Sequence, residues 1–145
     1  MNSTTDITFC VAPTNPSATL GFEAWLDDKI IFDVDSVQQS TEISIPVADD
    51  DAEHVLKLVL KGKCADHTTV DNDGNIISDS MLTITDMAFD GIALGQIVYN
   101  KAVYTHDFNG SGNTVEEHFF GIMGCNGTVA LNFSTPIYIW LLENM

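Results

Sequence analysis

Short runs of β-branched and aromatic residues recur along this chain, and most of them end at Gly, Pro, Asn or Asp. Such runs favour strands, whereas the helical spacing of apolar residues is almost absent. Roughly ten short strands separated by turn residues indicate a sandwich or a barrel. We therefore predict an all-β fold, a two-layer antiparallel jelly-roll sandwich, formed as a single domain by residues 1–145.

The predicted strands cover residues 7–11, 18–26, 29–34, 42–47, 54–61, 81–89, 97–104, 118–122, 128–133 and 137–142. Pro46 cannot donate a ladder hydrogen bond, so its strand is expected at a sheet edge. In the strand over 54–61, Leu56, Leu58 and Leu60 share one face, which we expect to be buried, while the lysine-bearing face is partly exposed.

The run 137–142 is apolar on both alternating faces. An ordinary half-exposed edge strand does not have this pattern. We predict a central strand between the two layers, and the alternative is a segment that another subunit covers.

The chain is strongly acidic, with 5 Lys and Arg against 21 Asp and Glu and a formal net charge of −16. A field of this sign repels phosphate backbones and anionic lipids, so we expect neither nucleic acid nor a membrane as a partner. The first six residues have neither a basic region nor an apolar stretch, so no signal peptide is expected. Three scattered cysteines fit thiols in a protein made in a reducing cytoplasm.

Acidic turns suggest calcium as a cofactor, because hard cations prefer several oxygen ligands. Alignment of Gly74 with the glycine of an EF-hand loop places Thr69 and Ser80 at its first and last positions, so an EF-hand is excluded and a hairpin turn is favoured. A calcium site built from separate turns stays open. Its candidate ligands are Asp49, Asp51, Asp71 and Asp73.

The histidines give weaker evidence for a chemical function than the acidic turns do. His106 precedes Asp107 and His118 follows two glutamates, which is a setting for zinc binding or acid–base work. We favour ordinary exposed histidines, and a metal-dependent enzyme using His67, His106 or His118 is a third hypothesis. Because the chain has no nucleophile elbow, Walker loop or dinucleotide fingerprint, we predict that it is not an enzyme.

Aromatic side chains can stack on sugar rings where several of them share one exposed surface. The pool comprises Trp25, Tyr99, Tyr104, Phe108, Phe119, Phe120, Tyr138 and Trp140. Core packing is the default for most of these residues. We select Trp25, Tyr104 and Phe108 as the candidate ligand-binding residues.

Three segments carry a family resemblance. Residues 22–33 read FEAWLDDKIIFD, residues 53–60 read EHVLKLVL, and residues 81–94 contain Ile84-Thr85-Asp86. They are similar to the W-L-D-G-K corner, the E-H-x-L-x-L-x-L strand and the closing strand of small jelly-roll carbohydrate-binding modules, especially the calcium-dependent xylan-binding type, with Asp28 in place of the corner glycine. The resemblance implies glycan binding. The family's calcium-binding carboxylates have no residue-by-residue match in this chain.

In overall character the whole chain resembles structural proteins of marine cyanobacterial phages. This resemblance implies a capsid decoration or tail-appendage domain in the virion, made in the host cytoplasm. Its expected partners are other virion proteins or further copies of itself, together with cell-surface glycan. Virion assembly is the leading functional hypothesis, and a calcium-dependent carbohydrate-binding domain is the alternative.

Overall fold

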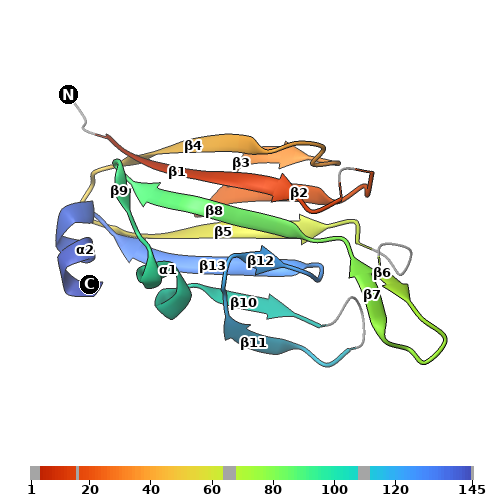
Figure 1. The fold of residues 1–145 in the computed structure, drawn as a ribbon. Coiled ribbons are helices and arrows are strands. Elements are labelled where there is room, and N and C mark those ends of the chain that lie inside the picture. The colour runs from red at the N-terminus through yellow and green to blue at the C-terminus, as the bar shows by residue number, and fades with distance from the viewer. Residues whose placement is uncertain (1–3, 16, 64–67, 108–111, 145) are drawn as a thin grey trace.

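The computed structural model describes residues 4–15, 17–63, 68–107 and 112–144 (Figure 1). Its strands are β1 (Thr4–Pro13), β2 (Gly21–Leu26), β3 (Lys29–Val34), β4 (Thr41–Ala48), β5 (Glu53–Lys61), β6 (Thr68–Val70), β7 (Ile76–Asp79), β8 (Leu82–Phe89), β9 (Ile92–Ala93), β10 (Val103–His106), β11 (Val115–His118), β12 (Ile122–Met123) and β13 (Gly127–Ser134). The helices are α1 (Gln96–Lys101) and α2 (Ile137–Asn144).

Two antiparallel sheets form a sandwich, which confirms the predicted fold class. The first sheet has the strand order β12-β8-β1-β4, with β9 paired to β8. The second has the order β11-β10-β13-β5-β2-β3. Strand β4, which contains Pro46, lies at an edge as predicted. The β6–β7 hairpin projects from one end of the molecule, and α2 lies at the other end (Figure 1).

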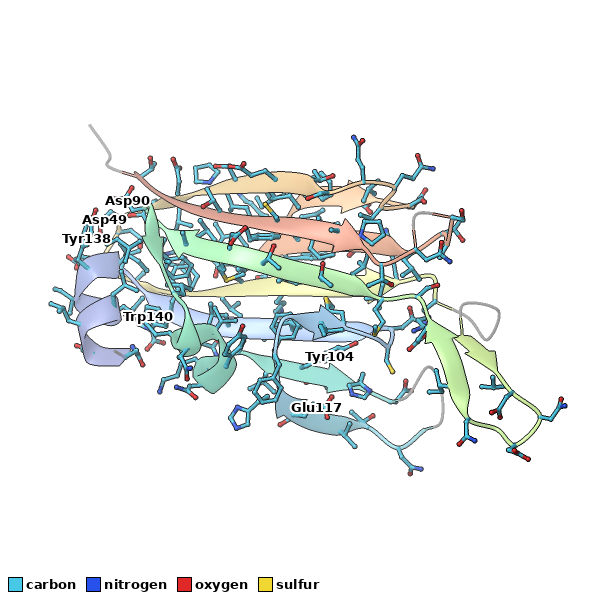
Figure 2. The ribbon with its side chains drawn as sticks, in the orientation of Figure 1. Asp49, Asp90, Tyr104, Glu117, Tyr138 and Trp140 are labelled. Atoms are coloured by element: carbon cyan, nitrogen blue, oxygen red, sulfur yellow. The ribbon has the colours of Figure 1, made fainter. Side chains whose placement is uncertain are left out.

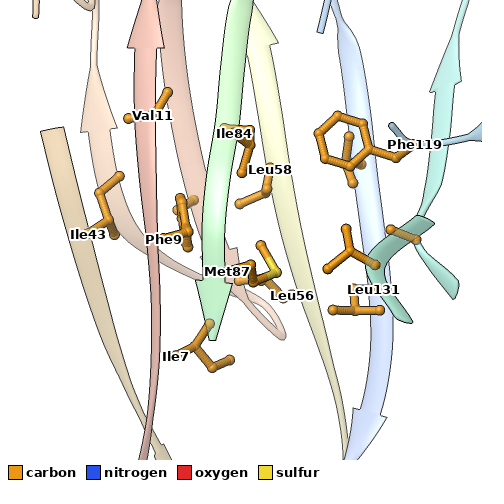
Figure 3. Close-up of a cluster of buried hydrophobic side chains, with 14 of the residues drawn as sticks. Ile7, Phe9, Val11, Ile43, Leu56, Leu58, Ile84, Met87, Phe119 and Leu131 are labelled. Carbon is orange, nitrogen blue, oxygen red and sulfur yellow. The ribbon is translucent and has the colours of Figure 1, made fainter. Parts of the chain in front are cut away.

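Alternating apolar residues from both sheets fill the space between the layers (Figure 3). On β5 the predicted leucine face is buried, with Leu56, Leu58 and Leu60 each 1% exposed, whereas the residues between them are only half-buried. Phe9 of β1 meets Phe22 of β2 edge-on, with ring centroids 6.3 Å apart. The period-two pattern of each strand therefore decides which of its residues enter the core.

The strand predicted over 137–142 is wrong, because this segment forms helix α2. Ile137, Trp140 and Leu141 are buried, as expected for one face of a helix. The Trp140 ring lies 5.6 Å from that of Phe89 and 6.3 Å from that of Phe133, so the helix covers one end of the core. Among the described residues, no helix has the length and apolar character needed to cross a membrane.

The single strand predicted over 97–104 is also wrong. Helix α1 occupies its first part, and β10 begins only at Val103. Ile97 and Val98 are buried while Tyr99 is exposed, so the β-branched residues pack their helix onto the sandwich instead of extending a sheet. The strand predicted over 118–122 is likewise divided, since β11 ends at His118 and β12 begins at Ile122.

Candidate functional site

A β-bulge in β8 turns a carboxylate out of the first sheet. In the pairing with β1, Cys10 lies opposite Thr85 and Thr8 lies opposite Ala88, so β8 carries one residue more than its partner between these pairs. Asp86 occupies this bulge with a φ of 58°, a left-handed conformation that Asp tolerates better than most residues. As a result Thr85 and Asp86 are both exposed, although they are neighbours in a strand.

Helix α1 presents an aromatic ring beside this bulge. Because Ile97 and Val98 are buried against the sandwich, the next residue of the helix, Tyr99, points outward and is 40% exposed. Its ring centroid lies 5.8 Å from that of Phe120, with 46° between the ring planes. The two rings come from separate segments and form one aromatic surface.

Phe120 is held there by the connection between β11 and β12. Phe119 is buried with 1% exposure, so its neighbour in this extended segment faces solvent, and Phe120 is 67% exposed. The carbonyl of Gly121 accepts a hydrogen bond of 2.8 Å from the amide of Ile84, which fixes the connection to β8. Gly121 has a φ of 91°, a conformation that favours glycine.

These segments enclose an open cleft of about 460 Å³ between β8, α1 and residues 119–122. This volume lies within the range of small-molecule sites. Tyr99, Phe120 and Ile122 supply exposed apolar surface, and Thr83, Thr85 and Asp86 supply hydroxyl and carboxylate groups. Among the described lining residues, Asp86 carries the only charge. The cleft can therefore bind a ligand that has both an apolar face and hydroxyl groups.

The structure does not bring the predicted ligand-binding aromatics together. Trp25 lies on β2, half-buried, and its indole Nε1 donates a 2.8 Å hydrogen bond to Glu23. Tyr104 lies on β10, three strand positions away, which is about 14 Å at the usual strand spacing. Phe108 lies outside the described residues.

Tyr104 has no ring face available to a ligand. It is 4% exposed, and its hydroxyl accepts a 2.9 Å hydrogen bond from the Cys125 amide and donates to the Cys125 carbonyl. Burial raises the pKa of Tyr104 to about 12. Figure 2 shows the residue on β10 with Glu117 on the neighbouring strand. Tyr104 is therefore a core residue, which corrects the binding role predicted for it.

The four predicted metal ligands lie in two separate places. Asp49 and Asp51 belong to the β4–β5 turn near α2 (Figure 2), whereas Asp71 and Asp73 belong to the β6–β7 hairpin at the other end. Asp71 Oδ1 accepts backbone hydrogen bonds of 2.9 Å from both Asp73 and Asn75, and these bonds hold its pKa below the ordinary value. Asp71 thus shapes the predicted turn.

Within the described parts of the chain, no three His, Cys, Asp or Glu side chains form a group that could hold a metal ion. The four candidate calcium ligands therefore do not come together with one another as one carboxylate cluster. The histidines give the same result. His106 is buried and its Nε2 lies 2.9 Å from Glu117 Oε1, His118 is exposed beside Phe120, and His67 falls outside the described residues.

The residues that line the cleft were only partly visible in the sequence. Tyr99 and Phe120 belong to the aromatic pool, but a strand over 97–104 does not predict the outward position that helix α1 gives Tyr99. The adjacent pair Phe119 and Phe120 carried a usable signal, since neighbours in an extended segment face opposite sides. Asp86 gave no such signal, because the bulge depends on the pairing with β1.

Comparison with known proteins supports the fold. The sequence matches no protein-family model and no curated protein. One similar solved structure is a selenomethionine form of vCBM60. Its description concerns circular permutation as an evolutionary link between two families of calcium-dependent carbohydrate binding modules. The TM-score is 0.55 at 8% sequence identity, over 88% of this chain and 89% of that chain. vCBM60 in complex with galactobiose has a TM-score of 0.51 at 12% identity, over 88% and 98% of the two chains. At these identities the likeness establishes the fold, and function must be argued from the site.

Proposed function

We propose that this domain binds carbohydrate in the cleft between β8, α1 and residues 119–122. The observation that carries the proposal is the exposed pair Tyr99 and Phe120, whose ring centroids lie 5.8 Å apart beside the hydroxyl and carboxylate groups of β8. A sugar ring has an apolar C–H face and a polar edge. The aromatic surface fits the first and the polar groups of β8 fit the second.

Asp86 gives the proposed site its orientation. A carboxylate accepts hydrogen bonds from hydroxyl groups, and a bond to a charged acceptor is stronger than one between neutral groups. Thr83 and Thr85 add hydroxyls that both donate and accept. The similarity in fold to vCBM60, which was solved with galactobiose, is consistent with this role and supplies a first probe.

Titration calorimetry with galactobiose tests the proposal. Replacing an aromatic stacking residue by alanine removes most of the apolar contact, so we expect Tyr99→Ala and Phe120→Ala each to weaken binding at least about tenfold. Both side chains are exposed, so neither change should unfold the domain. Tyr138→Ala is the matched control, because Tyr138 is 51% exposed on α2. Equal affinities of the wild type and all three variants would refute the proposed site.

The proposal is for binding without catalysis. Among the described residues that line the cleft, Asp86 is the only carboxylate, whereas most glycoside hydrolases use a pair of carboxyl groups across the scissile bond. Calcium is left out of the proposed site, since no three His, Cys, Asp or Glu side chains of the described residues form a group that could hold a metal ion.

Assembly is a second candidate function, favoured by the outer face of α2. Tyr138, Ile139 and Leu142 are 51%, 55% and 75% exposed, and together they form an apolar strip at one end of the molecule. This surface is the basis for the hypothesis of a role in a virion. A second copy of the chain or another virion protein would cover the strip. We take it as the weaker candidate, because the strip lacks the hollow and polar groups that the cleft combines.

Light scattering over a range of protein and salt concentrations tests assembly. Two copies with a charge of −16 repel each other, so self-association through an apolar strip should strengthen as salt screens the repulsion. Leu142→Ser should abolish it, and Ile76→Ser on the β6–β7 hairpin, where Ile76 is 66% exposed, is the matched control. A protein that stays monomeric at every salt concentration and fails to bind purified phage capsids would contradict the assembly hypothesis.

A further inference from the structure

A second hollow lies on the opposite edge of the sandwich from the proposed site. It has a volume of about 430 Å³ and lies between the end of β3, the 35–40 connection and the paired residues Val11 and Thr41 of β1 and β4. The proposed site borders β8 and β12 at one edge of the first sheet, whereas β4 forms the other edge. One ligand molecule of disaccharide size therefore cannot occupy both places.

Strand alternation keeps this second hollow free of charge. Phe32, Val34 and Ser36 line it, whereas Asp33 and Asp35 face the other way, with carboxylate oxygens 2.5 Å and 3.8 Å from the Lys61 ammonium. Its other polar lining comes from Gln38, Gln39 and Thr41. Although the chain carries 21 acidic and 5 basic side chains, every described residue that lines the hollow is neutral.

One polar atom of a residue that lines the hollow lacks a hydrogen-bond partner. The Ser36 hydroxyl oxygen is buried, and no described residue bonds to it. An unpaired buried hydroxyl is costly, so native structures nearly always pair such a group with protein, water or ligand. The backbone here is fixed, because the amide of Val37 donates a 2.8 Å hydrogen bond to the Leu20 carbonyl. This bond fixes the main chain beside Ser36, and the Ser36 side chain can still rotate about χ1.

We infer that this hollow is a second binding site, specific for a neutral hydroxylated ring such as one sugar residue. Amide and hydroxyl side chains both donate and accept, which matches hydroxyl groups and gives no advantage to an ion. The apolar floor of Val11, Phe32 and Val34 matches the C–H face of the ring. When the Ser36 side chain rotates toward the hollow, a ligand hydroxyl there would complete the missing hydrogen bond. This inference does not depend on the cleft beside β8, and binding at both edges would let one domain hold two glycan chains.

The test uses ¹⁵N-labelled protein that carries Tyr99→Ala and Phe120→Ala, so that the cleft beside β8 is disabled. Titration with galactobiose or cellobiose should cause saturable shifts of the amide signals of residues 36–41, with a dissociation constant on the order of 1 mM. Adding Ser36→Ala or Gln39→Ala should weaken this binding about fivefold or more. Gln96→Ala, an exposed glutamine on α1, is the matched control.

Thermal unfolding separates binding from folding. Ser36→Ala removes an unpaired buried hydroxyl, so the ligand-free variant should be as stable as its parent or more stable. No shift at residues 36–41, shifts that survive both additional substitutions, or a crystal soaked in disaccharide with only an ordered water on Ser36 would each overturn the inference. If the wild type binds at Tyr99 and Phe120 and nothing happens at residues 36–41, this inference fails while the proposed function stands.

Discussion

His54 on β5 holds Asp27 through its Nδ1 atom, 2.8 Å from Asp27 Oδ2, and its Nε2 atom lies 2.8 Å from Asp50 Oδ1. The β2–β3 and β4–β5 turns are thereby joined through one imidazole. Both ring nitrogens donate only when the ring is protonated. Thr135, which precedes α2, adds a 2.9 Å hydrogen bond from its hydroxyl to Asp50.

This arrangement predicts a pH-dependent contribution to stability. Burial by itself lowers the pKa of His54, but the hydrogen bonds to Asp27 and Asp50 outweigh it, so the pKa is raised above 6.5. The stabilisation is fully present below the unfolded pKa and is lost as the pH rises through the folded pKa. Burial raises the pKa of Asp27, but its hydrogen bonds with His54 and Val55 outweigh burial, so the net pKa is lowered below 3.8. The stabilisation that Asp27 contributes is therefore lost as the pH falls through its folded pKa.

Urea unfolding of wild type and His54→Gln over the pH range checks this. The free energy of unfolding of the wild type should exceed that of His54→Gln by the largest amount between about pH 4 and pH 6.5, and this difference should shrink at higher pH. His118→Gln is the control, because His118 is exposed in β11. A difference between wild type and His54→Gln that is the same at pH 5.5 and pH 9 would rule out the protonated bridge.

Asp86 is expected to set both affinity and charge selectivity in the proposed cleft. Asp86→Asn keeps the shape and the tolerance for a φ of 58° but removes the charge, so galactobiose affinity should fall about tenfold. The same change should improve binding of digalacturonate, because it removes a like charge.

Calorimetry with both disaccharides measures these two effects. Asp51→Asn is the matched control, since Asp51 is exposed and has a φ of 56° in a different turn. Stability should change by less than about 0.5 kcal/mol in either variant. An Asp86→Asn protein with unchanged selectivity would show that the carboxylate does not face the sugar.

Calcium is expected to have little effect on glycan binding. Asp49 and Asp51 are separated from Asp71 and Asp73 by the length of the sandwich, and the described residues hold no group of three His, Cys, Asp or Glu side chains that could bind a metal ion. Galactobiose affinity measured in EDTA and in excess calcium should therefore differ by less than about twofold, far below the tenfold that 1.4 kcal/mol of coupling produces. Binding that disappears in EDTA and returns with calcium would contradict this expectation.

Replacement of Asp79 and replacement of Lys63 should lower the stability of the domain by different amounts. The Lys63 side chain is 1% exposed, and its Nζ donates to Asp79 Oδ1 at 2.5 Å and to the Gly124 carbonyl at 2.6 Å. Asp79→Asn leaves a buried ammonium without its counter-charge and should cost about 3 kcal/mol. Lys63→Met should cost less, because water can reach the Asp79 side chain, which is 24% exposed. Chemical unfolding measures both losses of stability, and a larger loss for Lys63→Met would contradict this prediction.

Local sequence patterns predict several features of this fold correctly. The alternation in β4 and β5, the edge position of Pro46 and the turn at residues 71–75 follow from side-chain period, a missing amide and turn chemistry. Local patterns do not predict helices α1 and α2. A short apolar run has the same composition in a buried strand and in a buried helix, so periodicity cannot separate them.

The residue pattern alone predicts an acidic two-layer β-sandwich, since the alternation in each strand marks which of its side chains face the core. The positions of the two hollows depend on tertiary packing. Tyr99, Asp86 and Phe120 meet because a helix, a bulge and a connection are packed against one another, and Ser36 faces a hollow because two edge strands leave it open. Such contacts join residues far apart in the chain. Their positions depend on the packing of the whole molecule, which no local pattern contains.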